Sequence, residues 1–522
     1  MPTEDSTPRQ ETGPATPDRG RDWPVYHLTA RPDEGVWYPG DPNGAIYWNG
    51  RYHVMYIYQD RSQPGREHCW GHYSSPDLIN WTLHPPCLVP REEDTDTGTF
   101  SGNALVDKDG KPMLCWFGLG PKAGVCVATA EDDDLVVWKK HPANPIIPCP
   151  AEGEPDFGKY RVWDPYLWLE GDTYYCLLGG NNLPNGKDTL YLCKSQDLLE
   201  WEKVGPFYEG NPEWREDYED CSCPDFFALR DRYVLLCISH GIGSRCYIGK
   251  FDREHDRFEP EEHVRMNWRG GAFFAPESLL DEKERRVFWG WVTDPRTSSA
   301  QKEGSGFLSL PRVMDLSNGG TLQITPPDEL TSLRRNHRRL ENITIKHAET
   351  VLLEGISGSA LELEFDVDMS KTSNFGIMLR CSPDEEEKTL IWVVNGRGSM
   401  TVDASRSTTG KDVAYSSPPF MSYGMPDAKW NPHPYPSFEA PFALQKNERL
   451  RLRIYLDGCM LEAFANDRQC VTQMIFPARA DSLQVKATAW GAEQAVIHSV
   501  DAWDMGPINI DDQRGFKLSQ PE

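Results

Sequence analysis

A strand–turn–strand pattern that returns about every sixty residues constrains the fold of this chain more than any other feature. Each copy has an apolar run, a short polar turn and a second apolar run. The copies begin at Gly44, Asn103, Pro165, Pro224 and Pro276. A period of this length is typical of propeller blades or solenoid units. We therefore expect five repeats of one β-unit in the first part of the chain.

The turns and strands of these copies have the chemistry of β-hairpins. The turns carry Asn-Gly and Asp-Gly dipeptides, and the strands are rich in Val, Ile, Tyr, Phe and Trp. Three copies are followed by a segment that ends in a tryptophan, at Trp81, Trp138 and Trp201. We predict an outer strand there, with its indole packed between blades. Five radial, four-stranded blades form a β-propeller whose inner strands line a central channel.

The pattern changes after about Pro326. From there on, short strands alternate apolar and polar residues, as in LELEFDVDM from Leu361, and no helical period is present. Such strands favour a two-sheet β-sandwich. We expect an all-β chain with a disordered polar tail at 1–21, a five-bladed β-propeller at 22–335 and a β-sandwich at 336–522.

Composition excludes several classes of partner. The net charge of -26 argues against binding to nucleic acid or to an anionic membrane. The chain has no apolar run long enough to cross a membrane and no apolar core of a signal peptide in its first twenty residues, so we expect a cytoplasmic protein. The fourteen cysteines stand mostly alone within apolar runs and form no CxxC pair, which favours buried thiols and no structural metal.

Carboxylates stand where the predicted inner strands begin. Asp41 and Asp164 each precede a proline at such an entry, and a third entry has acidic residues just before Ser222. Buried acids cost several kcal/mol unless they are paired, so their recurrence at converging positions favours catalysis. Two carboxylates about 5 to 5.5 Å apart can cleave a glycosidic bond with retention, one as nucleophile and one as acid.

Several segments resemble glycoside hydrolase family 32, the β-fructofuranosidases that include invertases, inulinases and levanases. They are WYPGDPNG, GTFSGNALV, VWDPY, SCPD and SLPRVM in this order, followed by DGCMLEAFAND near Asp457. The resemblance covers nearly the whole chain after residue 22. It implies a glycosidase that cleaves β-fructofuranosidic bonds in sucrose, fructo-oligosaccharides or fructans by a retaining double displacement, with no metal or organic cofactor.

The resemblance also assigns residues. Asp41 occupies the nucleophile position, and Asp164 matches the aspartate that binds fructosyl hydroxyls and stabilises the transition state. The expected fructose-binding residues are Asn43, Trp70, Phe100, Ser101 and Ser222, together with Arg161.

The chain diverges from the family at its proton donor. Ser222 stands where the family has the glutamate that acts as acid/base, and serine is a poor proton donor near neutral pH. Asp220, on the same strand face, or Glu219, through a bulge, is expected to take over this role. The family's arginine before the second aspartate is Trp163, so Arg161, two residues earlier, is expected to approach the same sugar oxygens.

Other functions remain open from the sequence. The same intermediate supports a fructosyltransferase, in which another sugar replaces water, and a propeller glycosidase acting on arabinofuranosides also presents three acids. The missing glutamate is the best support for an inactive carbohydrate-binding homologue, which would bind a fructoside through the Ser222 region without cleaving it. The sandwich is compatible with added stability, contacts to the rim of the site or formation of a homodimer.

Overall fold

The computed structural model describes residues 22–29, 39–59, 68–91, 94–183, 186–216, 219–268, 271–294, 306–410 and 437–513. The tail predicted at 1–21 lies outside the described residues. Within these ranges the chain forms strands and two short 3-10 helices, Pro212–Trp214 and Asp328–Leu333. None of the helices in the described part has the length and apolar character needed to span a bilayer.

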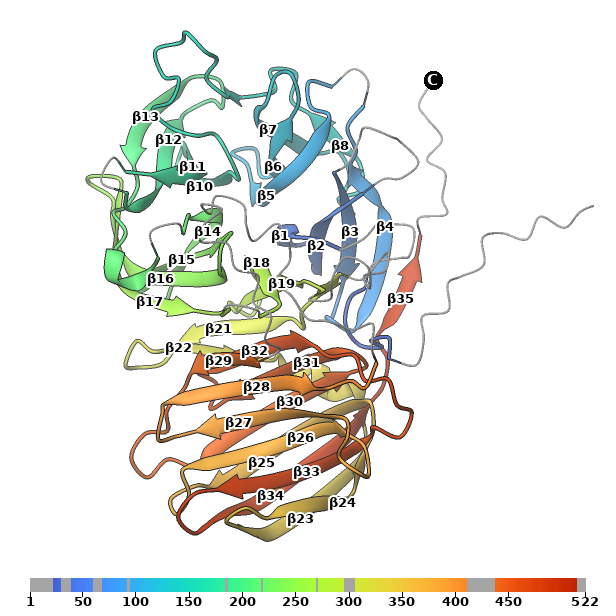
Figure 1. Ribbon diagram of the computed structural model, residues 1–522. Helices are drawn as coiled ribbons and strands as arrows, with labels where there is room; N and C mark the ends of the chain where they lie inside the picture. Colours follow the sequence, from blue (N-terminus) through green and yellow to red (C-terminus); the bar gives the residue numbers. More distant parts are fainter. Residues whose placement is uncertain are drawn as a thin grey trace, which may run out of the picture.

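The first part of the chain forms five sheets arranged radially, each built on antiparallel strands, and the predicted propeller is confirmed (Figure 1). Blade one contains β1 (Pro42–Trp48), β2 (Arg51–Tyr58), β3 (Cys69–Ser75) and β4 (Asn80–Leu88). Blade two contains β5 (Gly98–Val106), β6 (Pro112–Leu119), β7 (Gly124–Ala130) and β8 (Trp138–Lys140), and β9 (Ile147–Pro148) pairs with β7. Blade three contains β10 (Tyr166–Glu170), β11 (Thr173–Asn182), β12 (Asp188–Ser195) and β13 (Trp201–Pro206).

Blade four contains β14 (Ser222–Leu229), β15 (Arg232–Ser239), β16 (Gly243–Asp252) and β17 (Arg257–Arg265). Blade five contains β18 (Phe273–Leu280), β19 (Arg286–Val292), β21 (Arg312–Leu316) and β22 (Leu322–Thr325), and β20 (Phe307–Leu308) pairs with β19.

Two six-stranded sheets form the sandwich below the propeller in Figure 1. The order in one sheet is β23 (Arg334–Lys346), β34 (Gln494–Met505), β25 (Ala360–Asp368), β30 (Leu450–Asp457), β31 (Met460–Ala465) and β32 (Gln469–Met474). The order in the other is β24 (Thr350–Ser357), β33 (Gln484–Trp490), β26 (Asn374–Cys381), β27 (Lys388–Val394), β28 (Ser399–Arg406) and β29 (Ser437–Pro441). Their inner faces share one apolar core.

The outer-strand tryptophans pack as the sequence predicts. In each case the indole N–H donates to the carbonyl of the leucine three residues earlier: Trp81 to Leu78 (2.9 Å), Trp138 to Leu135 (2.8 Å) and Trp201 to Leu198 (3.0 Å). The Trp81 ring also meets Trp289 of blade five, with the ring centroids 6.4 Å apart. Trp81 therefore packs at the interface between blade one and blade five.

Polar side chains join neighbouring inner strands around the channel. They lie two residues beyond each strand entry, and each accepts a hydrogen bond from a backbone N–H of the next inner strand. The pairs are Asn43 with Gly102 (2.9 Å), Asn103 with Leu167 (2.8 Å), Asp225 with Ser278 (2.9 Å) and Glu277 with Ala45 (3.0 Å). Because these bonds join four of the five neighbouring pairs of inner strands, they also fix the positions of the residues at those strand entries.

The entries themselves are irregular. The pairing of β1, β5, β14 and β18 with their neighbours shifts near the start of each strand. Asp164, Cys223 and Ala275 have positive φ angles of 35°, 44° and 41°, a strained conformation for residues other than glycine. Bulges of this kind redirect a side chain, here at the mouth of the channel.

Both ends of the described chain cross between the two domains. β35 (Asn509–Asp512) leaves the sandwich and pairs in parallel with β4 of blade one. Near the other end, His27 lies between Asp457 (2.7 Å) and Glu462 (3.2 Å) of the sandwich. Glu462 also accepts a 2.6 Å hydrogen bond from Arg312 of blade five, and both side chains are buried.

Candidate active site

Asp41 is held at the entry of blade one by its neighbours. The Ser101 hydroxyl donates a 2.7 Å hydrogen bond to Asp41 Oδ2, and the Asn43 amide donates a 2.8 Å bond to the Asp41 carbonyl. Burial raises the pKa of the Asp41 carboxyl, while the Ser101 hydrogen bond and the charge of His240 oppose the rise. The side chain is therefore fixed in place and is less acidic than a solvated aspartate.

Asp164 and Asp41 converge on one sulfur atom. Cys223 Sγ lies 3.5 Å from Asp164 Oδ2 and 3.8 Å from Asp41 Oδ2. Burial, reinforced by the charge of Asp41, raises the pKa of Asp164 to about 6 although His240 opposes the shift. Burial and the two carboxylates raise the pKa of Cys223 well above its usual value, so its thiol stays protonated and can donate to either aspartate.

Asp220 lies at the same mouth but is held by a histidine. Its Oδ2 accepts from the Ser222 hydroxyl (2.9 Å) and is 2.7 Å from His240 Nδ1, while its Oδ1 accepts from the His240 backbone N–H (2.9 Å). Burial would raise the pKa of Asp220, but the charge and hydrogen bonds of His240 outweigh it and hold the pKa below its usual range. A carboxyl with a lowered pKa is a poor proton donor, so the structure does not favour Asp220 as the acid, and that role stays a prediction.

Glu219 takes no part in the group of residues at the mouth. Its carboxylate is buried and accepts two hydrogen bonds from Arg265, at 2.9 and 2.6 Å, and one from the Glu216 backbone N–H at 2.8 Å. Burial would raise its pKa, but the Arg265 hydrogen bonds outweigh it and lower the pKa. The bulge that was expected to turn Glu219 inward falls later, between Ser222 and Asp225. The prediction of Glu219 as a proton donor is therefore wrong.

Two predicted sugar-binding residues lie in the core. Trp70 is fully buried, and its indole N–H donates to the Phe100 carbonyl at 3.1 Å. Asn43 is only 1% exposed, and its side-chain amide forms hydrogen bonds with the backbone of Asp41 and of Gly102. Neither side chain has exposed surface that could contact a sugar, and this corrects the prediction that Trp70 and Asn43 bind fructose. They position Phe100 and Asp41 instead.

Aromatic side chains form the wall between blades two and three. The half-buried Phe100 ring stacks on His68, with centroids 4.3 Å apart, and lies 5.6 Å from the Trp163 ring. The exposed Arg161 guanidinium sits over the Trp163 ring, 4.7 Å from its centroid. Arg161 and the Ser222 hydroxyl both lie beside Gly180, within 4 Å of the position that a Cβ atom on this glycine would occupy. Arg161 precedes β10 and lies outside any strand, so the strand-face argument does not apply to it, and its contact with a sugar stays a prediction.

Sequence reasoning missed His240 and Cys223. The register contains a signal for His240, because Ser222 pairs with Ile238 in antiparallel strands. The residue two positions before Ser222 therefore lies opposite the residue two positions after Ile238. These residues are Asp220 and His240. Cys223 follows from the blade repeat, since it precedes a proline as Asp41 and Asp164 do.

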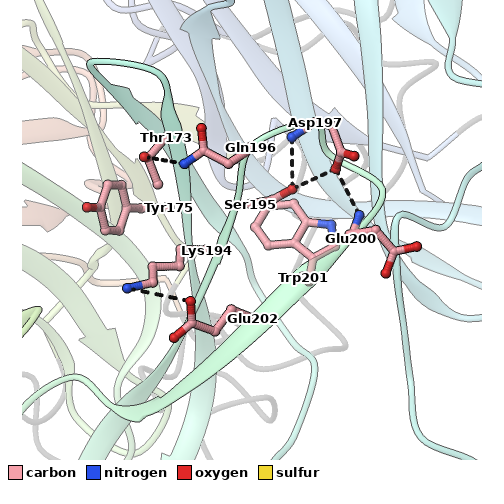
Figure 2. Close-up of a pocket in the computed structure, with 9 residues that line it drawn as sticks. All are labelled: Thr173, Tyr175, Lys194, Ser195, Gln196, Asp197, Glu200, Trp201 and Glu202. Atoms are coloured by element: carbon pink, nitrogen blue, oxygen red, sulfur yellow. Dashed lines mark hydrogen bonds and ion pairs between the residues drawn. The ribbon is translucent and has the colours of Figure 1, made fainter.

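A separate surface pocket of about 480 Å³ lies on blade three, where β11, β12 and β13 line it (Figure 2). Its polar groups are bonded to one another: Lys194 lies 3.6 Å from Glu202, and the Gln196 amide donates to Thr173 at 2.7 Å. No residue of the inner strand β10 lines it. It is therefore distinct from the carboxylates at the channel mouth.

A half-buried Asp41 and a buried Asp164 that converge at the inner-strand entries of a five-bladed propeller suit a glycosidase, because glycosidic bonds are cleaved between paired carboxyl groups. Residues 32–326 match the N-terminal domain of glycosyl hydrolases family 32, and residues 329–504 match the C-terminal domain of the same family. The chain belongs to glycosyl hydrolases family 32, and the resemblance found in the sequence is confirmed.

Relatives and solved structures agree with this assignment. The chain is 28% identical to a levanase of Bacillus subtilis (strain 168), over 93% of this chain and 71% of the relative. It is 25% identical to the beta-fructofuranosidase insoluble isoenzyme 2 of Daucus carota, over 89% and 86%. A fructan 1-exohydrolase IIa variant from Cichorium intybus, solved with 1-kestose, superposes with a TM-score of 0.77 at 22% identity, over 94% of this chain and 99% of that one.

Proposed function

We propose that this protein hydrolyses β-fructofuranosidic bonds of sucrose, fructo-oligosaccharides or fructans with retention of configuration. Asp41 attacks the anomeric carbon of the fructosyl unit and forms a fructosyl ester while the bond to the leaving sugar breaks. Asp164 accepts hydrogen bonds from fructosyl hydroxyls, which strengthen as positive charge develops on the ring. Water then attacks the ester from the side that the leaving sugar has vacated and releases fructose.

The observation that carries this proposal is the convergence of Asp41 and Asp164 on Cys223 Sγ at 3.8 and 3.5 Å. Burial raises the pKa of both carboxyl groups, and the charge of Asp41 raises the pKa of Asp164 further, so the arrangement is costly to keep ionised. A purely structural site gains nothing from this arrangement, whereas a nucleophile and a stabiliser of an oxocarbenium-like transition state both need it. The levanase and the kestose-bound exohydrolase among its relatives favour a fructoside as the substrate.

The test is an incubation of the purified full chain with sucrose, 1-kestose, inulin and levan, with the products separated by chromatography. We expect fructose to appear from at least one of them. In added methanol we expect methyl β-fructofuranoside, because a retaining enzyme passes its intermediate to an alcohol with the original configuration.

Two variants make this test specific. Asp41→Asn should lose activity, since an amide cannot form the ester. Asp315→Asn, which changes an exposed aspartate bonded to Arg230, should behave as wild type. Absence of fructose and of transfer products from every fructoside overturns the proposal, and a methyl α-fructofuranoside product overturns the retaining mechanism.

A further inference from the structure

Among the described residues at the strand entries, Ser222 and the two acids before it are poorly placed to give a proton to the leaving sugar, and Asp41 and Asp164 already have other roles. Ser222 occupies the family's position and is fully buried, with its hydroxyl bonded to Asp220 at 2.9 Å. Asp220 is ionised and Glu219 is paired with Arg265. A leaving sugar alcohol needs protonation as its bond breaks, so another group of the site must supply the proton.

His240 is positioned for this task. It follows β15, and the register of β15 with β14 brings it opposite Asp220. Its side chain is 17% exposed, and its ring meets Phe274 of blade five edge to face, with centroids 6.4 Å apart. His240 and Ser222 share the Asp220 carboxylate, and the residue after Ser222, Cys223, places its thiol 3.5 Å from Asp164 and 3.8 Å from Asp41. His240 therefore borders the space in which the bond is cleaved.

The Asp220 carboxylate fixes the orientation of the imidazole. It lies 2.7 Å from Nδ1 and also accepts from the His240 backbone N–H at 2.9 Å. With Nδ1 engaged in this way, Nε2 is the nitrogen that exchanges a proton with a substrate. Ser222 and the guanidinium of Arg245, which donates to the Asp220 carbonyl, keep Asp220 in place in turn.

We propose that His240 is the general acid and base of this active site and that Asp220 is its positioning residue. The inference rests on the proposed hydrolysis of fructosides and names the group that serves its proton transfers. Serine is tolerated at 222 because a histidine from the neighbouring strand has taken over the role of the missing glutamate.

The proton is accounted for in both steps. In the first, Nε2–H of the imidazolium protonates the glycosidic oxygen as the bond to the anomeric carbon breaks and Asp41 forms the ester. In the second, the neutral imidazole takes a proton from water while the water oxygen bonds to the anomeric carbon and Asp41 leaves as a carboxylate. The imidazolium is restored and no other reactant is needed.

The charges that face His240 suit both steps. Burial lowers the pKa of His240, but the carboxylates of Asp220, Asp164 and Asp41 outweigh it and raise the pKa to about 9, so the free enzyme holds the proton at neutral pH. Formation of the ester removes the charge of Asp41, which lowers the pKa of His240 and so favours the neutral imidazole that the second step needs. The Cys223 thiol stays neutral, and the Arg245 guanidinium donates to the Asp220 carbonyl. Neither group therefore reverses the change in the pKa of His240 between the two steps.

The test compares two leaving groups in His240→Asn and His240→Gln. On sucrose or 1-kestose we expect kcat/KM to fall about 10² to 10⁴-fold, the range for loss of a general acid. A nitrophenyl β-fructofuranoside needs no protonation, so its rate of ester formation should fall far less. Added azide, which needs no base, should then raise turnover of the nitrophenyl substrate and yield fructosyl azide.

His255→Asn is the matched control. His255 Nδ1 is also 2.7 Å from an aspartate, Asp252, but its side chain is 69% exposed on an outer turn. It should match wild type on both substrates. In Asp220→Asn the loss of activity at high pH should move to lower pH, because His240 loses its nearest carboxylate.

Equal losses on both leaving groups, no effect of azide or unchanged rates in the His240 variants overturn the role of His240 while the proposed function stands. A wild-type protein that acts on no fructoside overturns both. If neither His240 variant folds, the wild-type profile and the Asp220→Asn profile decide: a high-pH limb that does not move overturns the inference.

Discussion

Removal of the Ser101 hydroxyl tests how the site keeps its nucleophile ionised. This hydroxyl donates to Asp41 Oδ2 at 2.7 Å, and a hydrogen bond to a charged group contributes about 1.5 to 3 kcal/mol. Since one pKa unit corresponds to about 1.4 kcal/mol, its loss raises the pKa of Asp41 by about 1 to 2 units. The Cys223 thiol, 3.8 Å from the same oxygen, offsets part of this, so we expect a rise of about one unit in Ser101→Ala.

The sign of the effect follows from the chemistry. Asp41 attacks only as a carboxylate, so activity is lost as the pH falls through its pKa, and a raised pKa moves that loss to higher pH. The assay is the pH dependence of kcat/KM on one fructoside. Ser195→Ala is the control, because it removes a 3.1 Å bond to Asp197 at the outer edge of blade three. An unmoved low-pH limb in Ser101→Ala, or an equal displacement in Ser195→Ala, refutes the reasoning.

Three further predictions concern buried charges. Glu219→Gln should lower the free energy of unfolding by about 3 kcal/mol in denaturant titrations, because Arg265 loses its partner, and should leave the ratio of rates on the two leaving groups unchanged. Asp164→Asn should lower kcat/KM about 10² to 10³-fold with no loss of thermal stability, since burial already disfavours this charge. Burial lowers the pKa of His27, but hydrogen bonds to carboxylates such as Asp457 raise it from 6.5 to about 9. The resulting stabilisation of roughly 3 kcal/mol is complete below pH 6.5 and lost as the pH rises through 9, a fall that His27→Gln should abolish in unfolding measured across buffers.

The fold was largely predictable because its signals are local and repeated. Hairpin turns between β-rich runs recur in each blade, so five copies identify the propeller even though no copy is decisive alone. The tryptophans at Trp81, Trp138 and Trp201 lie in outer strands as expected, at the start of each strand. Alternation along the later strands likewise predicts the sandwich, since each of its sheets buries only one face.

The site was predictable only in part. Asp41, Ser101 and Asp164 stand at strand entries that the blade repeat superimposes, so their convergence follows from the repeat. The sequence does not show which partner each polar side chain meets. Trp70 turned out to support the backbone of Phe100 from the core.

The sequence by itself determined a five-bladed propeller with a sandwich, the carboxylates at the strand entries and the serine that stands in place of the family's acid. Only the tertiary structure decided what surrounds that serine, because each acidic group takes its state from residues on other strands. Arg265 of β17 makes Glu219 a structural residue, and His240 after β15 keeps Asp220 ionised. Strand periodicity reports which face a residue occupies, whereas its pKa depends on the charges that the fold places opposite it.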